Sequence, residues 1–327
     1  MSKARNIAAL STVEVGATAD QTKADLNAIG VSGGRKNLII NGAMQVSQRG
    51  AYTSATSLTT SSVYYLDRFK SKCDGVTGTL THKVDQSVNG KITDTVLLSS
   101  TSTATGRLET LQMIEDLQQF KGQVTTFSAW VKSNNGNARV IMHTDGSNVQ
   151  TSSNSHTGGG AWELLKGTVT NATNITNMNL YCGIQAAGTG NIAGVASGDY
   201  FEIAFLQTEL GSVATDFEHR SYGEELALCQ RYYSKNARAI GVWQSTAHFR
   251  VVGQFATTMR ATPSVSRTDS AGYHENWHIQ GFNGFTINTI YGDNKGFDVY
   301  CNSTSGSSTA REMAMMSKDT IQFDAEL

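Results

Sequence analysis

Residues 125–132, Thr-Thr-Phe-Ser-Ala-Trp-Val-Lys, alternate in character from one position to the next. The apolar residues Phe127, Ala129 and Val131 fall on one side of an extended chain, whereas Trp130 falls on the other side among polar neighbours. A period of two is typical of a strand that buries one face and leaves the other facing outward. This stretch therefore predicts a strand of a β-sheet with one buried face.

The same period continues on the C-terminal side of this strand. It recurs in three groups: Ala138, Val140 and Met142; Met178, Leu180, Cys182 and Ile184; Phe201, Ile203 and Phe205. Glycine- and asparagine-rich turns separate the groups, so we expect an antiparallel β-sandwich over residues 37–220. Residues 108–120 are an exception, because apolar residues recur there every three positions. That spacing predicts that part of this stretch is a short helix that crosses the sandwich.

A second β-rich domain is expected over residues 221–327. Ser221 and Glu224 have the spacing of a capping box, which predicts a linking helix. Leu226, Cys229 and Tyr233 would form the apolar stripe of this helix. Beyond it the period of two returns, and strands are expected near residues 249–255, 263–267, 285–290, 297–301, 312–316 and 320–323.

The first 36 residues differ from the rest of the chain. Residues 20–29 predict a short helix, but its segment offers few apolar side chains, chiefly Leu10, Val13, Leu26 and Ile29. A short helix with so little apolar surface is not stable alone. We therefore expect residues 1–36 to be an attachment segment that docks on its own copies or on a partner.

The composition excludes several classes of protein. Only 16% of the 327 residues are charged and the formal net charge is −1, so the chain has no broad basic face for nucleic acid. No apolar run is long enough to cross a bilayer, and the polar N-terminus predicts no signal peptide. The four cysteines are far apart and without paired spacing, which favours free, buried thiols.

The sequence contains no convincing catalytic or metal-binding motif, and no cofactor fingerprint. His274 and His278 have a spacing that suits a metal only on a helix, and a loop or strand is expected there. Glu115 and Asp116 could serve as paired carboxylates in a glycan-cleaving enzyme. Their position beside the predicted helix favours solvation or capping, so we predict a protein that is not an enzyme.

Aromatic side chains are the better candidates for ligand binding. Sugar-binding proteins stack rings on the apolar faces of saccharides, and polar groups then fix the orientation. The candidates in the C-terminal domain are Trp243, Tyr273, Trp277 and Tyr291. Surface recognition and core packing remain equal alternatives for these four. In the sandwich, Trp130 faces away from the core stripe, so it is either exposed or packed in an interface.

Four motifs resemble a family of tailed-bacteriophage virion proteins. They lie at residues 37–44 with 48–50 (NLIINGAM and QRG), at 65–69 (YLDRF), at 215–233 (TDFEHRSYGEELALCQRYY) and within 255–265 around MRATP. The resemblance implies a tail fibre or other appendage in which residues 37–220 form a jelly roll similar to carbohydrate-binding modules. It also implies a homotrimer, located in the virion and assembled in the host cytoplasm, that contacts other virion proteins through the N-terminal segment and host polysaccharide elsewhere. A capsid decoration or head-fibre protein without receptor binding is the main alternative, and a glycan depolymerase is the second.

Overall fold

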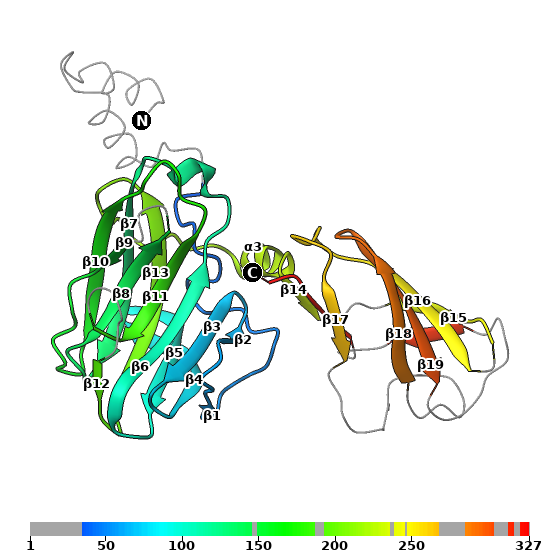
Figure 1. Cartoon of the computed structure of the whole chain (residues 1–327), viewed down its shortest axis with the longest axis horizontal. Helices are drawn as coiled ribbons and strands as arrows, with labels where there is room; N and C mark the ends of the chain where they lie inside the picture. The colour runs from blue at the N-terminus through cyan, green and yellow to red at the C-terminus, as the bar shows by residue number, and fades with distance from the viewer. Residues whose placement is uncertain are drawn as a thin grey trace, which may run out of the picture.

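The computed structural model describes residues 35–145, 149–186, 193–235, 239–245, 247–267, 285–303, 313–316 and 321–326. The expected N-terminal attachment segment, with its short helix and with Leu10, Val13, Leu26 and Ile29, lies outside the described residues. Two β-rich bodies follow one another along the chain, with helix α3 (Tyr222–Gln230) between them (Figure 1). The all-β fold class expected from the sequence is confirmed.

The first body is an antiparallel sandwich of two sheets. Sheet I has the order β1 (Thr56–Ser57), β4 (Gly78–Val88), β5 (Lys91–Ser100), β13 (Tyr200–Leu210), β7 (Val124–Ser133), β10 (Trp162–Thr170). Sheet II has the order β2 (Val63–Leu66), β3 (Phe69–Asp74), β6 (Ala104–Met113), β11 (Met178–Ile184), β8 (Ala138–Thr144), β9 (Val149–Ser152), with β12 (Ala193–Val195) paired to β6. From β5 to β8 the chain alternates between the two sheets, so neighbours within each sheet are distant in sequence.

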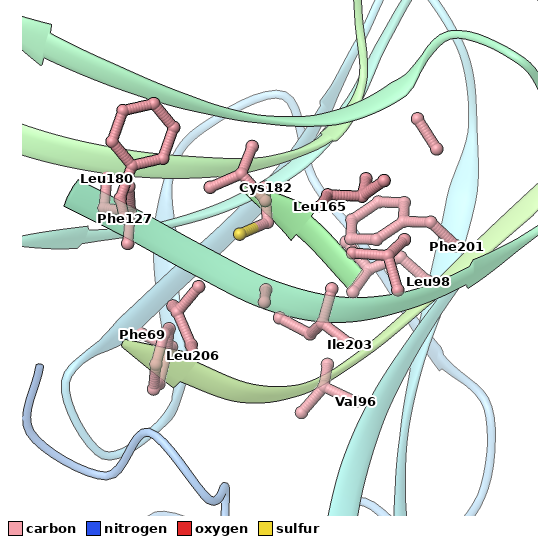
Figure 2. Packing of buried hydrophobic residues seen from close by; sticks show 14 of the residues in the cluster. Phe69, Val96, Leu98, Phe127, Leu165, Leu180, Cys182, Phe201, Ile203 and Leu206 are labelled. Atoms are coloured by element: carbon pink, nitrogen blue, oxygen red, sulfur yellow. The ribbon is translucent and has the colours of Figure 1, made fainter. Parts of the chain in front are cut away.

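The core of the sandwich lies between the two sheets. Phe127 and Ile203 of sheet I face Leu180 and Cys182 of sheet II, and all four are fully buried or nearly so (Figure 2). The inward stripe expected for residues 125–132 is confirmed, because Phe127, Ala129 and Val131 all belong to this core. All four cysteines of the chain are free and buried, as the sequence predicts.

The short helix expected within residues 108–120 is limited to their last four residues. Strand β6 continues to Met113, and only Leu117–Phe120 forms a helical turn, the 3₁₀-helix η1. The three-residue spacing misled because side chains alternate along a strand: Leu108 points into the core, whereas Leu111 lies on the outer face.

Helix α3 begins as the sequence predicts and ends earlier. The hydroxyl of its N-cap Ser221 accepts a hydrogen bond of 3.3 Å from the Glu224 amide. The helix ends at Gln230, so Tyr233, expected on its apolar stripe, begins strand β14 (Tyr233–Lys235) instead. No helix among the described residues is long and apolar enough to span a membrane.

The second body contains two smaller sheets. Sheet III has the order β14, β21 (Ile321–Asp324), β17 (Ser264–Arg267). Sheet IV has the order β18 (Phe285–Gly292), β19 (Gly296–Ser303), β16 (His248–Gln254), β15 (Ala239–Trp243), β20 (Met313–Met316). Every strand expected beyond the helix has a counterpart here. Phe249, Phe297 and Phe323 are central members of the shared core.

Charged side chains join the two bodies, and we call this region the joint. Arg49 of the sandwich lies 3.1 Å from Asp324 and 3.2 Å from Glu326, near the C-terminus of the described chain. Arg68 pairs with the same Glu326 and lies with its guanidinium carbon 3.5 Å from the ring centre of Tyr232. Because Arg68 and Glu326 are almost completely buried, the joint is a packed interface rather than a loose linker.

Gly42 lies so close to the backbone of β13 that no side chain fits at this position. A Cβ atom at Gly42 would lie 2.2 Å from the backbone oxygen of Leu206. The substitution Gly42→Ala is expected to lower the free energy of unfolding by about 1–3 kcal/mol, because the backbone must shift to relieve the overlap. Chemical denaturation measures the change.

Gly223→Ala is the matched control, since no atom lies within 4 Å of a Cβ built at this helical position. It is expected to raise stability by roughly 0.5–1 kcal/mol through helix propensity. Equal effects of the two substitutions would contradict the packing explanation.

Candidate functional site

Of the four aromatic candidates in the C-terminal domain, Trp243 is placed clearly by the structure. Its side chain is 1% exposed and packs on Phe249 with ring centres 5.1 Å apart, inside the core of the second body. Surface recognition by Trp243 is therefore wrong, and the packing alternative holds. The sequence could not decide this because its polar neighbours belong to the turn that follows β15.

For the other three aromatic candidates the structure gives less information. Tyr291 lies in β18, paired with Asp298 of β19. Tyr273 and Trp277 lie outside the described residues, as do His274 and His278. Within the ranges that are described, no three His, Cys, Asp or Glu side chains gather as a metal site would require.

The carboxylate of Glu115 contributes to the joint. It accepts a hydrogen bond from the Tyr232 hydroxyl and lies 3.4 Å from the Arg260 guanidinium. Burial and this carboxylate together raise the pKa of Tyr232. Asp116 is exposed, with a positive φ of 54°. Glu115 is thus engaged in contacts with Tyr232 and Arg260 rather than in helix capping, and the side chain of Asp116 makes no capping hydrogen bond to η1.

The described residues do form a pocket, on the outer face of sheet I. The pocket has a volume of about 100 Å³, and Trp130 of β7 and Leu164 of β10 form one wall. These two residues are paired across the strands, so their side chains lie next to each other on the same face. Trp162, two residues before Leu164, packs against the same apolar cluster.

A β-bulge supplies the floor of the pocket. The pairing of β13 with β7 shifts between Ala204 and Gln207, and Phe205 inside the shift has a positive φ of 52°. A bulge of this kind redirects a side chain that the alternation would point inward. The Phe205 ring consequently packs on Phe217 on the outer face, with ring centres 5.0 Å apart.

The rim of the pocket is polar. Asn89 and Lys91, at the tip of the β4–β5 hairpin, and Thr215 and Asp216, from the segment after β13, line it. All four are exposed. Buried Val88 anchors the hairpin tip against Phe205 and Ala204, so the tip is held over the sheet. The rim therefore offers an ammonium, an amide, a hydroxyl and a carboxylate around an aromatic floor.

This combination suits a small ring that has one apolar face and several hydroxyl groups. Aromatic side chains cover the apolar face of such a ring, and a few polar groups fix its orientation. The sequence placed Trp130 on the outer face correctly but did not find the pocket. The signal that could have found it is that Trp130 and Trp162 both lie off the core stripes of their strands.

Comparisons with known proteins give few matches. No family model matches the chain, and no curated protein matches it. Among solved structures, it is similar to the enzymatically active domain of bacteriophage CBA120 tailspike protein 4, with 13% identity and a TM-score of 0.34. That match covers 54% of this chain and 21% of the other, so the chain spans about a fifth of the length of the tailspike structure.

Two further similar structures have names that refer to carbohydrates. One contains the CBM22-1–GH10 modules of Clostridium thermocellum endo-1,4-β-D-xylanase 10B (10% identity, TM-score 0.29, covering 57% of this chain and 30% of the other). The second is a putative sugar-binding protein from Bacteroides thetaiotaomicron (11% identity, TM-score 0.26, covering 54% of this chain and all of the other). TM-scores this low do not establish a common function.

Proposed function

We propose that the chain is a non-catalytic attachment protein whose sandwich binds a saccharide in the pocket on the outer face of sheet I. The observation that carries this proposal is the aromatic lining of the pocket, with Trp130 in a wall and Phe205 and Phe217 in the floor, beneath a polar rim. Lys91 and Asp216 at the rim are exposed and have no hydrogen-bond partner for their charged groups within the described residues, so they are available to hydroxyl groups of a ligand.

The biological setting is also a proposal. The four sequence motifs resemble those of tailed-phage virion proteins, so the saccharide would belong to a bacterial surface and the protein to a tail fibre or similar appendage. The N-terminal segment would attach the chain to other virion proteins, and trimerisation would combine three weak sites into one strong attachment. A capsid decoration protein without receptor binding is the alternative.

Substitution of Trp130 tests the saccharide site. Trp130→Ala is expected to weaken binding of a host surface oligosaccharide by at least about tenfold, because stacking on the pocket wall is lost. Isothermal titration calorimetry on the full chain measures the affinity. The matched control is Tyr222→Ala, which removes an aromatic ring that is 55% exposed on α3 and outside the pocket. Wild-type affinity in Trp130→Ala would exclude the pocket.

The enzymatic alternative is tested with the same oligosaccharide. A non-catalytic protein releases no reducing ends on prolonged incubation, whereas a depolymerase does. Release that disappears in Glu115→Gln or Asp116→Asn would identify a depolymerase. Cryo-electron microscopy of intact particles, tracing residues 1–36, separates a tail fibre from a capsid decoration.

A further inference from the structure

Three lysines lie around the pocket on the outer face of sheet I. Lys91 lines the rim, at the tip of the β4–β5 hairpin. Lys132 of β7 lies two positions beyond Trp130, and Lys166 of β10 lies two positions beyond Leu164, so both are on the pocket face of the sheet. Because Trp130 and Leu164 are paired across antiparallel strands, the two strand lysines lie on opposite sides of this apolar pair.

The strand pairing sets the spacing of Lys132 and Lys166. Lys132 is paired with Trp162 and Lys166 with Ser128, so four strand positions, or about 13 Å, separate them along the strands. Lys166 is exposed and Lys132 is half-buried, on the two strands that end sheet I (Figure 1). Ser128 itself lines the pocket. A ligand that extends from the pocket along the strands therefore meets an ammonium group in either direction.

The three lysines form no ion pair within the described ranges of the chain. Glu202 is the cross-strand neighbour of Lys132, but its carboxylate accepts hydrogen bonds from Lys83 at 2.9 Å and from the Thr95 hydroxyl at 2.6 Å. This carboxylate is also almost completely buried. The positive charge of Lys132 is therefore not neutralised by its neighbour in the sheet.

Two further carboxylates lie near the pocket. Glu209 is buried and accepts from the Gln207 amide group at 3.0 Å and from the backbone amide of Thr215 at 2.8 Å. Asp216 is exposed at the rim, where the Nζ atom of Lys36 donates to its backbone oxygen at 2.5 Å. One exposed carboxylate thus faces three unpaired lysines, and a further cation lies beside it.

An acidic saccharide complements this arrangement. A sugar ring over Trp130 and Leu164 buries its apolar face, as aromatic side chains favour. Anionic groups on the neighbouring sugars then meet Lys132 and Lys166, and hydrogen bonds between charged groups are stronger than those between neutral groups. A lysine ammonium suits this task because it donates in several directions from a flexible stem.

We propose that the ligand of the pocket is a linear acidic polysaccharide, such as one that contains uronic acids, bound along β7 and β10. One sugar lies in the pocket beside Lys91, and the anionic groups of the chain pair with Lys132 and Lys166. This inference rests on the proposed saccharide-binding function and adds the chemical class of the saccharide.

Calorimetry with matched oligosaccharides tests the inference. The probes are an oligogalacturonide and a hyaluronan oligosaccharide, each compared with its carboxyl-reduced counterpart of the same length and titrated into the full chain. The wild-type chain is expected to bind at least one acidic probe at least about tenfold more tightly than its reduced counterpart. Affinity for this acidic probe should fall as ionic strength rises, whereas affinity for the reduced form should not.

Charge-removing substitutions locate the preference. Lys132→Gln and Lys166→Gln are each expected to reduce it by about two- to fivefold, the range of an exposed ion pair, and the double substitution should reduce it further. Lys295→Gln is the matched control, because Lys295 is exposed in the turn between β18 and β19 of the second body. The control should keep the wild-type preference.

Equal affinity of the wild-type chain for each acidic probe and its reduced counterpart would overturn the inference. An acidic preference that the three lysine substitutions reduce equally would overturn it as well. Failure of the pocket itself looks different, because Trp130→Ala would then bind the reduced probes as the wild-type chain does. If no probe binds and Trp130→Ala abolishes oligomerisation in sedimentation, the face is a contact between copies of the chain and both proposals are wrong.

Discussion

Replacing Arg68 with methionine is expected to lower the free energy of unfolding by about 3–5 kcal/mol. The guanidinium group of Arg68 is 1% exposed, pairs with Glu326 and donates to the Met113 carbonyl oxygen at 2.8 Å. Methionine keeps most of the apolar stem but leaves the buried Glu326 carboxylate with Arg49, 3.2 Å away, and the backbone amide of residue 68, 3.3 Å away, as its remaining partners. An insufficiently paired buried charge accounts for most of the expected loss.

A double-mutant cycle isolates the pair. Glu326→Gln is expected to be destabilising by itself, whereas the combination with Arg68→Met should cost less than the sum of the two changes, because no buried charge is then left without its partner. Equilibrium denaturation gives the energies, and calorimetry shows whether the two bodies still unfold together. Additive effects, or a loss below about 1 kcal/mol in Arg68→Met, would contradict a buried, energetically important pair.

Each of the four sequence motifs contributes a residue to the joint. Arg49 lies in the first motif, Arg68 in the second, Tyr232 in the third and Arg260 in the fourth. Arg260 donates from its Nε atom to the carbonyl oxygen of Ala325 at 2.9 Å. Arg49 and Arg68 pair with Glu326, and the ring of Tyr232 packs against the guanidinium group of Arg68. The motifs that suggested a family therefore maintain the arrangement of the two bodies. The third motif also contributes Thr215, Asp216 and Phe217 to the pocket.

The sequence predicted those features of the fold that depend on residues close together in the chain. Alternation along residues 125–132 revealed the buried face because each strand of a one-sided sheet repeats it. The capping box at Ser221 revealed where α3 begins because the hydroxyl contacts an amide only three residues away. The helix prediction for residues 108–120 extended too far because strand β6 has apolar residues on both faces, and these happen to recur every three positions.

The pocket could not be derived in this way. The pocket requires the bulge at Phe205 and the approach of the β4–β5 hairpin tip to Phe217, which are distant in sequence. The order and register of strands as distant in sequence as β7 and β13 have no local signature, so the pocket became visible only in three dimensions.

Lowering the pH from about 8 to about 4 is expected to stabilise the joint through Asp67, by on the order of 3 kcal/mol. Asp67 is 0% exposed, and burial raises its pKa from 3.8 to about 6. The opposing contributions come from Gln48, whose amide and side-chain nitrogens donate to the carboxylate at 2.5 and 2.7 Å, and from Arg49.

The sign follows from the direction of this shift. Because the folded chain binds the Asp67 proton more tightly than the unfolded chain, the contribution to stability is complete below pH 3.8 and is lost as the pH rises through about 6. Asp67→Asn should flatten the dependence of stability on pH between these limits, since the amide does not titrate. Burial also raises the pKa of Glu109, so this residue adds to the dependence of stability on pH. The part due to Asp67 is therefore the difference between wild type and variant in the slope of unfolding free energy against pH, measured by denaturant titrations at several pH values. An unchanged slope in Asp67→Asn would mean that Asp67 is ionised throughout this range, held by Arg49 and Gln48. The joint would then keep the same stability in acidic and neutral surroundings as far as this residue is concerned.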